Sequence, residues 1–163
     1  MKNKKTPEDS SVTMSEIVLP SHANALGSIF GGTIMSWIDI AGAISAGKHA
    51  RNIVVTASID ALHFIAPVRV GHVVTIKASV NRAWRSSMEV GVRVDSEDLL
   101  TGKTVHNVTA YTTFVALDKN GKPTTVPELT PDTPEDRRRF EQALLRKESR
   151  LELLQEYKKN GHL

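Results

Sequence analysis

The stretch from Thr33 to His49 limits most strongly what this chain can fold into, because as a helix it leaves almost no polar face. Its apolar residues are Ile34, Met35, Trp37, Ile38, Ile40, Ala41, Ala43, Ile44 and Ala46. A helix that is apolar all round is a buried helix. No apolar run in the chain reaches the roughly 18 residues of a membrane span. The stretch therefore predicts the central helix of a soluble fold.

Strand patterns stand on both sides of this helix. The predicted strands are residues 12–19, 53–62, 73–84, 88–94 and 104–117, which are rich in β-branched residues or alternate apolar with polar residues. Short links between successive strands favour antiparallel pairing. One long apolar helix must then be covered by one sheet. We predict an α+β fold in which a curved antiparallel sheet wraps around one long central helix.

The chain divides into three predicted parts. Residues 1–11 are expected to form a flexible leader, and residues 12–122 a single domain. Residues 123–163 are expected to form a proline-bearing linker and a charged helix. Thr133 suits the N-cap of that helix, and Pro134 suits its first position. Its thin apolar stripe predicts that the helix packs on the domain or on a neighbouring subunit.

Composition excludes several kinds of chemistry. The chain has no cysteine, which rules out disulfides, thiol nucleophiles and cysteine metal sites. The histidines have no metal-ligand spacing with nearby acids, so we assign no metal. The net charge of +3 is too small to argue for nucleic acid. No apolar run follows the charged N-terminus, so we expect no signal peptide, no membrane partner and a cytoplasmic location.

Two basic stretches could suit phosphate. Five bases lie between positions 69 and 93 against the single acid Glu89: Arg69, Lys77, Arg82, Arg85 and Arg93. They could face a phosphorylated small molecule or form an exposed face of strands, and the sequence leaves both open. For the triplet Arg137–Arg139 a solvated helix face is favoured.

Asp39 is the residue most indicative of chemistry. It is the only acid between Glu16 and Asp60, and it lies on the helix that should be buried. A lone carboxylate in apolar surroundings is costly unless it is paired or hydrogen-bonded, and such positions often mark working sites. The alternative is a structural carboxylate bonded to a nearby polar group: Asn24, Thr56 or Lys48. We favour the functional interpretation.

Gly31 and Gly32 stand at the expected start of the same helix. The first turn of a helix has unpaired backbone N–H groups, and glycine lets a substrate approach them closely. A developing oxyanion could be held there. Asn24 lies in the preceding loop, where an amide can orient water or donate to a carbonyl oxygen. The alternatives are a tight loop-to-helix turn for the glycines and a turn-stabilising asparagine.

The string from His22 to Asp39, His-Ala-Asn-Ala-Leu-Gly-Ser-Ile-Phe-Gly-Gly-Thr-Ile-Met-Ser-Trp-Ile-Asp, resembles the hotdog-fold acyl-CoA thioesterases. The bacterial YciA-type enzymes and the brain-type cytosolic acyl-CoA hydrolases are the most similar groups. Four further segments agree in order: 55–57, 64–71, 85–87 and 114–118. The resemblance covers about residues 12–122. His63 stands where relatives commonly carry asparagine, so it is given no role.

The resemblance implies a hydrolase of acyl-CoA thioesters, in which coenzyme A is part of substrate and product and no further cofactor is required. It implies a homodimer whose sheets join, and often a trimer of dimers, which is a homohexamer. The active site would span the dimer interface, with Asn24 from one subunit and Asp39 from the other. The residues that the resemblance assigns to coenzyme A are Thr56, Phe64, Pro67, Val68, Arg69, Gly71, Arg85, Ser86 and Ser87.

The expected mechanism combines these groups. The backbone of Gly31 and Gly32 polarises the thioester carbonyl, and Asn24 positions the carbonyl or the water. Asp39 acts as general base for water or as a direct nucleophile, and the sequence leaves both open. Three rival functions are a non-catalytic acyl-CoA sensor, an acyl-CoA dehydratase of the same fold and a nucleotide-binding module. The sensor lacks an output module, the dehydratase lacks its usual acid–histidine pair, and the nucleotide module has only the basic stretch in its favour.

Overall fold

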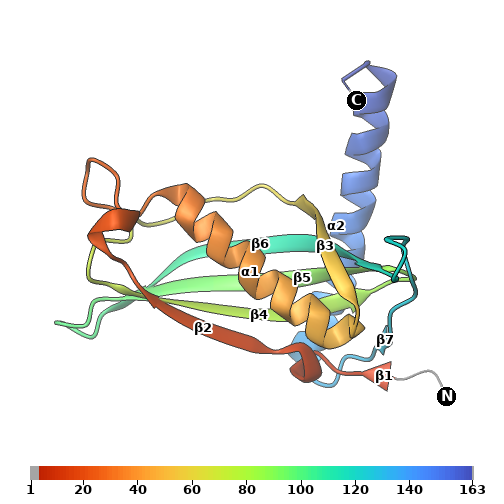
Figure 1. Cartoon of the computed structure of the whole chain (residues 1–163), viewed down its shortest axis with the longest axis horizontal. Coiled ribbons are helices and arrows are strands. Elements are labelled where there is room, and N and C mark those ends of the chain that lie inside the picture. Colours follow the sequence, from red (N-terminus) through yellow and green to blue (C-terminus); the bar gives the residue numbers. More distant parts are fainter. Residues whose placement is uncertain (1–3, 163) are drawn as a thin grey trace.

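A computed structural model describes residues 4–162 and has the predicted hotdog architecture, in which a curved sheet wraps around one long helix (Figure 1). The helices are α1 (Gly31–Ala50) and α2 (Pro134–Lys159), with short 3-10 turns η1 (Glu8–Ser10) and η2 (Pro20–His22). The strands are β1 (Lys4–Lys5), β2 (Val12–Ile17), β3 (Ile53–Ile59), β4 (Val73–Ala83), β5 (Ser87–Glu97), β6 (Thr104–Leu117) and β7 (Glu128–Leu129).

The main sheet has the strand order β2-β4-β5-β6-β3, and every neighbouring pair is antiparallel. The alternating apolar residues of β4 and β5 face α1 and are buried: Val74, Ile76, Ala78, Val80, Met88, Val90, Val92 and Val94. Period-two alternation places every second side chain on one face of a sheet. The predicted antiparallel sheet is therefore confirmed, with β3 and β2 as its edge strands.

Helix α1 packs closely on the sheet through one side only. A Cβ atom added at Gly42 would lie 2.9 Å from Cε2 of Phe114 on β6, so glycine is required for this close approach. The opposite side of α1 exposes Met35, Ile40 and Ile44, at 41%, 46% and 44% of their surface. The prediction of a helix buried all round is therefore wrong for the single chain, because the sheet covers only one side of it.

The segment before β2 was predicted to be flexible, but from Lys4 onward it packs on the domain. Strand β1 pairs in parallel with β7, and the buried Ser10 hydroxyl accepts a hydrogen bond from the backbone of Val80 at 2.9 Å. The Lys5 ammonium donates to the carbonyls of Lys48 and His49 at 2.7 and 2.8 Å. These are orphan carbonyls of the last turn of α1, where a cation is favoured. Residues 1–3 of the predicted leader lie outside the described part of the chain.

Helix α2 begins as the sequence predicts. The Thr133 hydroxyl accepts from the Asp136 backbone at 3.1 Å, and the Asp136 carboxylate accepts from the Thr133 backbone at 3.0 Å. The helix packs on the face of the sheet opposite α1. Of the two expected contact surfaces, its own domain and a neighbouring subunit, α2 contacts its own domain. The C-terminal end of α2 projects away from the sheet (Figure 1).

Buried charge holds α2 in place. Glu89 on β5 is fully buried and pairs with Arg146 at 2.7 Å and with Arg150 at 3.2 Å. Arg150 also pairs with Asp60, the residue after β3, at 2.7 Å. The Arg146 guanidinium lies 3.6 Å from the centre of the Tyr111 ring. The helix is thus tied both to the centre of the sheet and to the loop that follows β3.

Candidate active site at the free edge of the sheet

Asp39 is bonded to the edge strand. Its carboxylate oxygen Oδ1 accepts a hydrogen bond from the Thr56 hydroxyl on β3 at 2.7 Å. Among residues 4–162, Asp39 takes part in no salt bridge, and the other carboxylate oxygen has no hydrogen-bond donor. The Thr56 bond fixes one oxygen and leaves the second able to bind water.

This carboxylate lies within an exposed apolar surface formed by α1 and β3, which we call the α1–β3 patch: Met35, Ile40, Ile44, Ile53 and Val55. Among residues 4–162, strand β3 pairs only with β6, so its other edge keeps unpaired backbone groups. An open, apolar edge strand is a ready surface for pairing with another chain. In the single chain, Asp39 therefore lies beside an open strand edge and an exposed apolar surface.

The start of α1 offers backbone donors. Gly31 and Gly32 are its first two residues, Phe30 is the N-cap, and no side chain caps the helix. A Cβ atom at Gly32 would lie only 2.6 Å from the Phe30 ring, so a larger residue there would displace this exposed ring. The Phe64 ring lies 3.4 Å from the place where a Gly31 Cβ would be. Unpaired amides beside an aromatic ring can bind a carbonyl oxygen.

Asp39 and the two glycines do not form one site within a single chain. Asp39 follows Gly31 by eight residues on the same helix, which corresponds to about 12 Å along the axis. A base and an oxyanion donor must both lie within about 3 Å of the reacting groups. One chain alone cannot meet this requirement with these groups.

Asn24 lies exposed in the loop before α1. Its side-chain oxygen accepts from the backbones of Leu26 and Ser28 at 2.9 and 3.3 Å, which is the turn-stabilising role considered for this residue. Its side-chain nitrogen donates to no group among the described residues. The amide can therefore stabilise the loop and still donate to a substrate.

The residues assigned to coenzyme A fall into two groups at opposite ends of α1. Phe64 and the segment 67–71 belong to the loop between β3 and β4, beside the start of the helix. Arg85, Ser86 and Ser87 belong to the β4–β5 hairpin, where Arg85 lines a 740 Å³ cavity together with Ala50 at the helix end. The helix has 20 residues, so the groups lie about 30 Å apart.

Two of the assigned residues have other tasks in the single chain. Val68 is 2% exposed and belongs to the core, so only its backbone could contact a ligand, and its carbonyl already accepts from Ile29 at 2.7 Å. The Thr56 hydroxyl bonds Asp39. Sequence patterns do not show where the hydroxyl group of an edge-strand threonine points. The Thr56–Asp39 hydrogen bond could therefore be considered from the sequence but not established.

The bases between positions 69 and 93 do not form one face. Arg82 stacks on Phe140, with 4.0 Å between guanidinium and ring centre, and Arg93 pairs with Asp95 at 2.8 Å. Arg69 and Arg85 lie in the two loops at opposite ends of α1. Within the described part of the chain, this stretch therefore does not build a single phosphate-binding surface.

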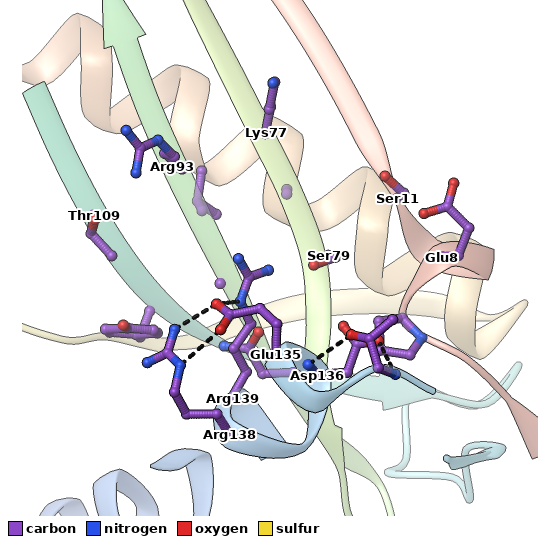
Figure 2. Close-up of a pocket in the computed structure, with 17 residues that line it drawn as sticks. Glu8, Ser11, Lys77, Ser79, Arg93, Thr109, Glu135, Asp136, Arg138 and Arg139 are labelled. Carbon is purple, nitrogen blue, oxygen red and sulfur yellow. Dashed lines mark hydrogen bonds and ion pairs between the residues drawn. The ribbon is translucent and has the colours of Figure 1, made fainter. Parts of the chain in front are cut away.

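A charged cavity of about 520 Å³ lies between the start of α2 and the sheet face that does not face α1 (Figure 2). Its bases are Lys77, Arg93, Arg138 and Arg139, and its acids are Glu8, Glu135 and Asp136. Figure 2 shows Glu135 bonded to both neighbouring arginines, with Nε of Arg138 and of Arg139 at 2.9 and 3.0 Å. The hydrogen bond from Arg138 lowers the pKa of Glu135 to about 2. These compensated surface pairs agree with the solvated-face interpretation of the arginine triplet.

Sequence reasoning missed the residues that hold α2 on the sheet. Arg146 and Arg150 are one helical turn apart and converge on Glu89. The available signal was the combination of two arginines at i and i+4 with a lone acid on a predicted strand.

Within residues 4–162 there is no group of three or more histidines and acids that could hold a metal ion. Neither helix in this range has the length and hydropathy that a membrane-spanning segment requires.

A sequence model described as the thioesterase superfamily matches residues 26–103. The acyl-CoA thioester hydrolase YkhA of Bacillus subtilis, itself described as uncharacterized, is 41% identical over 136 residues, which cover 80% of this chain and 79% of the relative.

Two solved structures are similar over nearly their whole length. An acyl-CoA hydrolase from Staphylococcus aureus, in complex with butyryl coenzyme A, coenzyme A and coenzyme A disulfide, is 36% identical with a TM-score of 0.90, covering 97% of this chain and 96% of that one. Alanine variants of that enzyme at an asparagine, an aspartate and a threonine have also been solved. An apo-hexameric acyl-CoA thioesterase is 41% identical with a TM-score of 0.90, covering 93% and 97%. The chain therefore belongs to the hotdog-fold acyl-CoA thioesterases of the thioesterase superfamily.

Proposed function

We propose that this protein hydrolyses the thioester of acyl-CoA to a free fatty acid and coenzyme A, with Asp39 as its catalytic carboxylate. The observation that carries the proposal is the Asp39–Thr56 hydrogen bond of 2.7 Å within an exposed apolar surface. The positions substituted in the S. aureus enzyme are an asparagine, an aspartate and a threonine separated by 15 and 17 residues, and the same spacings separate Asn24, Asp39 and Thr56.

The chemistry needs a water oxygen to attack the thioester carbonyl carbon, a C–S bond to break and a proton to reach the leaving sulfur. As general base, the free oxygen of Asp39 takes the proton of the water, while Thr56 holds the other oxygen. As nucleophile, the same oxygen attacks the carbonyl and water then cleaves the resulting anhydride. Both routes place negative charge on the carbonyl oxygen, where amides such as those of Gly31 and Gly32 stabilise it.

The site is completed by a second copy of the chain. A two-fold pairing of β3 with its counterpart would join the sheets and cover the α1–β3 patch on both copies. Asn24 and the glycine amides would then come from one subunit and Asp39 from the other. The separation of about 12 Å between Asp39 and Gly31 within one chain supports this arrangement.

The same pairing also explains the divided coenzyme A residues. Two helices related by a two-fold axis perpendicular to them run antiparallel, so the start of α1 lies beside the end of the partner helix. The loop with Phe64 from one subunit and the hairpin with Arg85 from the other would then approach one ligand. The hexameric relative supports the assembly of three such dimers. We expect no cofactor besides the coenzyme A of the substrate.

A thiol-release assay across acetyl- to palmitoyl-CoA tests the function, because hydrolysis frees the thiol of coenzyme A. We expect hydrolysis by the wild type and a loss of at least about 100-fold in kcat for Asp39→Asn. Thr56→Val should lose about 10-fold or more, because it removes one hydrogen bond to a charged group, and Thr56→Ser should retain activity. A folded, assembled Asp39→Asn protein with the wild-type rate would refute the role of Asp39.

The same assay separates hydrolysis from the rival function of an acyl-CoA sensor. A sensor would bind acyl-CoA, as calorimetry can measure, and would release no thiol above the uncatalysed rate. Wild-type protein that binds without turnover at any chain length would therefore replace the proposed enzyme by the sensor.

A further inference from the structure

We infer that Asn107 is a positioning residue for this reaction, which holds the loop between β3 and β4 over the start of α1. The inference rests on the proposed function, because its importance for activity depends on that loop contacting substrate. Asn107 is fully buried on β6, and the sequence analysis gave it no part in the site.

A β-bulge places Asn107 where it can reach the loop. In the ladder between β5 and β6, Val94 pairs with Val108 and Asp95 pairs with His106, so Asn107 is the extra residue. A bulge redirects one side chain out of the regular alternation and is frequent beside active sites. Here the extra residue turns toward the segment that follows β3.

The bulge is fixed from the other face of the sheet. The two ring nitrogens of His106 lie 2.9 Å from the Asp95 carboxylate and 3.0 Å from the Thr109 hydroxyl. These bonds join residues before and after the bulge and connect them to β5. The backbone of Asn107 is therefore held in one place.

Asn107 makes two hydrogen bonds to adjacent residues of the loop. Its side-chain nitrogen donates to the carbonyl of Ala66 at 3.2 Å, and its own carbonyl accepts from the backbone N–H of Ile65 at 2.9 Å. Among the described residues these are the hydrogen bonds that connect residues 61–67 to the rest of the chain. The ends of the loop are held separately, by Arg150 at Asp60 and by Ile29 at Val68.

The held segment carries Phe64, whose ring lies against Gly31 at the start of α1. Phe64 and Ile65 are 47% and 67% exposed, so their own packing does little to fix them. Asn107 therefore determines where Phe64 lies above the helix amides that we propose as carbonyl donors. The Oδ1 atom of Asn107 is buried without a hydrogen-bond partner in the described structure. A buried unpaired acceptor lowers stability, so stability alone is a poor explanation for asparagine here.

The test compares Asn107→Ala with Ser10→Ala, which also removes the buried hydrogen bonds of one side chain away from the loop: the Ser10 hydroxyl accepts from the Val80 backbone and donates to the Pro7 carbonyl. For Asn107→Ala we expect kcat/KM to fall about tenfold, mainly through a higher KM for acyl-CoA, as for the loss of one hydrogen bond. Hydrogen exchange of residues 61–67 should accelerate in the same variant. Ser10→Ala should keep the wild-type KM and the wild-type exchange of this segment.

A double-mutant cycle with Phe64→Ala shows whether Asn107 acts through that ring. If it does, the double variant should lose no more than about the larger single effect, because both changes remove the same positioned group. Faster exchange with an unchanged KM would overturn the inference, since Asn107 would then only hold the loop. Unchanged exchange together with an unchanged KM would also overturn it. If the wild type hydrolyses no acyl-CoA, the proposed function fails, and the exchange experiment still decides whether Asn107 holds the loop.

Discussion

At the residue scale, the orientation of Asp39 depends on its neighbour Thr56. Thr56 donates to one carboxylate oxygen at 2.7 Å, which stabilises the charged group and fixes its orientation. The second oxygen remains free for water. The glycine amides that would complete the chemistry lie about two helical turns away on the same chain, so in the proposed mechanism a second copy of the chain supplies them.

The buried His49 links the end of α1 to solution pH. Its Nε2 atom lies 2.9 Å from the Pro127 carbonyl, and burial lowers the pKa of its ring because the charged form loses solvation. The unfolded chain titrates near the ordinary value of about 6.5 and so binds the proton more readily than the folded chain. The free energy of unfolding should therefore be highest above about pH 6.5 and should decrease as the pH falls below this value.

Urea unfolding between pH 7.5 and 5.5 measures this effect. The free energy of unfolding of the wild type should fall with decreasing pH more steeply than that of His49→Gln, by up to about 1.4 kcal/mol per pH unit. The variant is expected to be less stable at both pH values. Parallel pH dependences of wild type and variant would show that His49 titrates alike in both states.

The residues of the proposed site could be singled out from the sequence to different degrees. Asp39 could be found because a lone acid on an apolar helix breaks a pattern, and Gly31 and Gly32 could be placed because helix starts have their own chemistry. Asn107 gave no such signal, because its contacts depend on a one-residue bulge and on a loop about 40 positions earlier in the chain. Patterns of local periodicity carry no information about such distant contacts.

At the scale of elements, α2 is held by charge more than by its apolar stripe. Arg146 and Arg150 reach the fully buried Glu89, while Leu151 and Leu154 remain 48% and 44% exposed. A buried carboxylate without its partner is strongly unfavourable. Helix and sheet are thus coupled through one acidic residue on β5.

Replacing Arg146 by alanine should therefore lower the free energy of unfolding by about 2 kcal/mol, because the buried Glu89 would lose its bidentate partner and keep only the longer contacts to Arg150. The matched control is Arg139→Ala on the same helix, where the partner Glu135 is exposed; this change should lower the free energy of unfolding clearly less. Urea denaturation of the two variants gives the comparison. Equal losses would show that burial of Glu89 does not govern the docking of α2.

Most helices and strands could be predicted from the sequence, because period-two and helical patterns are local. The final strand, β6, has the predicted bounds, and α2 begins after the predicted cap at Thr133. For residues 4–11 the prediction of a flexible leader was wrong, because their order depends on distant partners: β7, the backbone of Val80 and the last turn of α1. Polar composition indicated flexibility, but tertiary hydrogen bonds decide the outcome.

At the scale of the whole molecule, three features of the single chain support the proposed dimer. It exposes an apolar helix side beside an unpaired edge strand, and it holds its acid and its backbone donors about 12 Å apart on one helix. It also divides most of the residues assigned to coenzyme A between the two ends of α1. The proposed two-fold dimer would account for all three features, and it would bury the side of α1 that is exposed in the single chain.

Complementation between two inactive variants tests this account most directly. Asp39→Asn and Asn24→Ala are each expected to be nearly inactive in thiol release, and the two are denatured together, refolded and checked for mixed dimers. Half of randomly formed dimers are mixed, and each mixed dimer has one intact site of two, so the mixture should recover about a quarter of the wild-type rate. Confirmed mixed dimers whose rate stays at the average of the two parent variants would contradict a site shared between subunits.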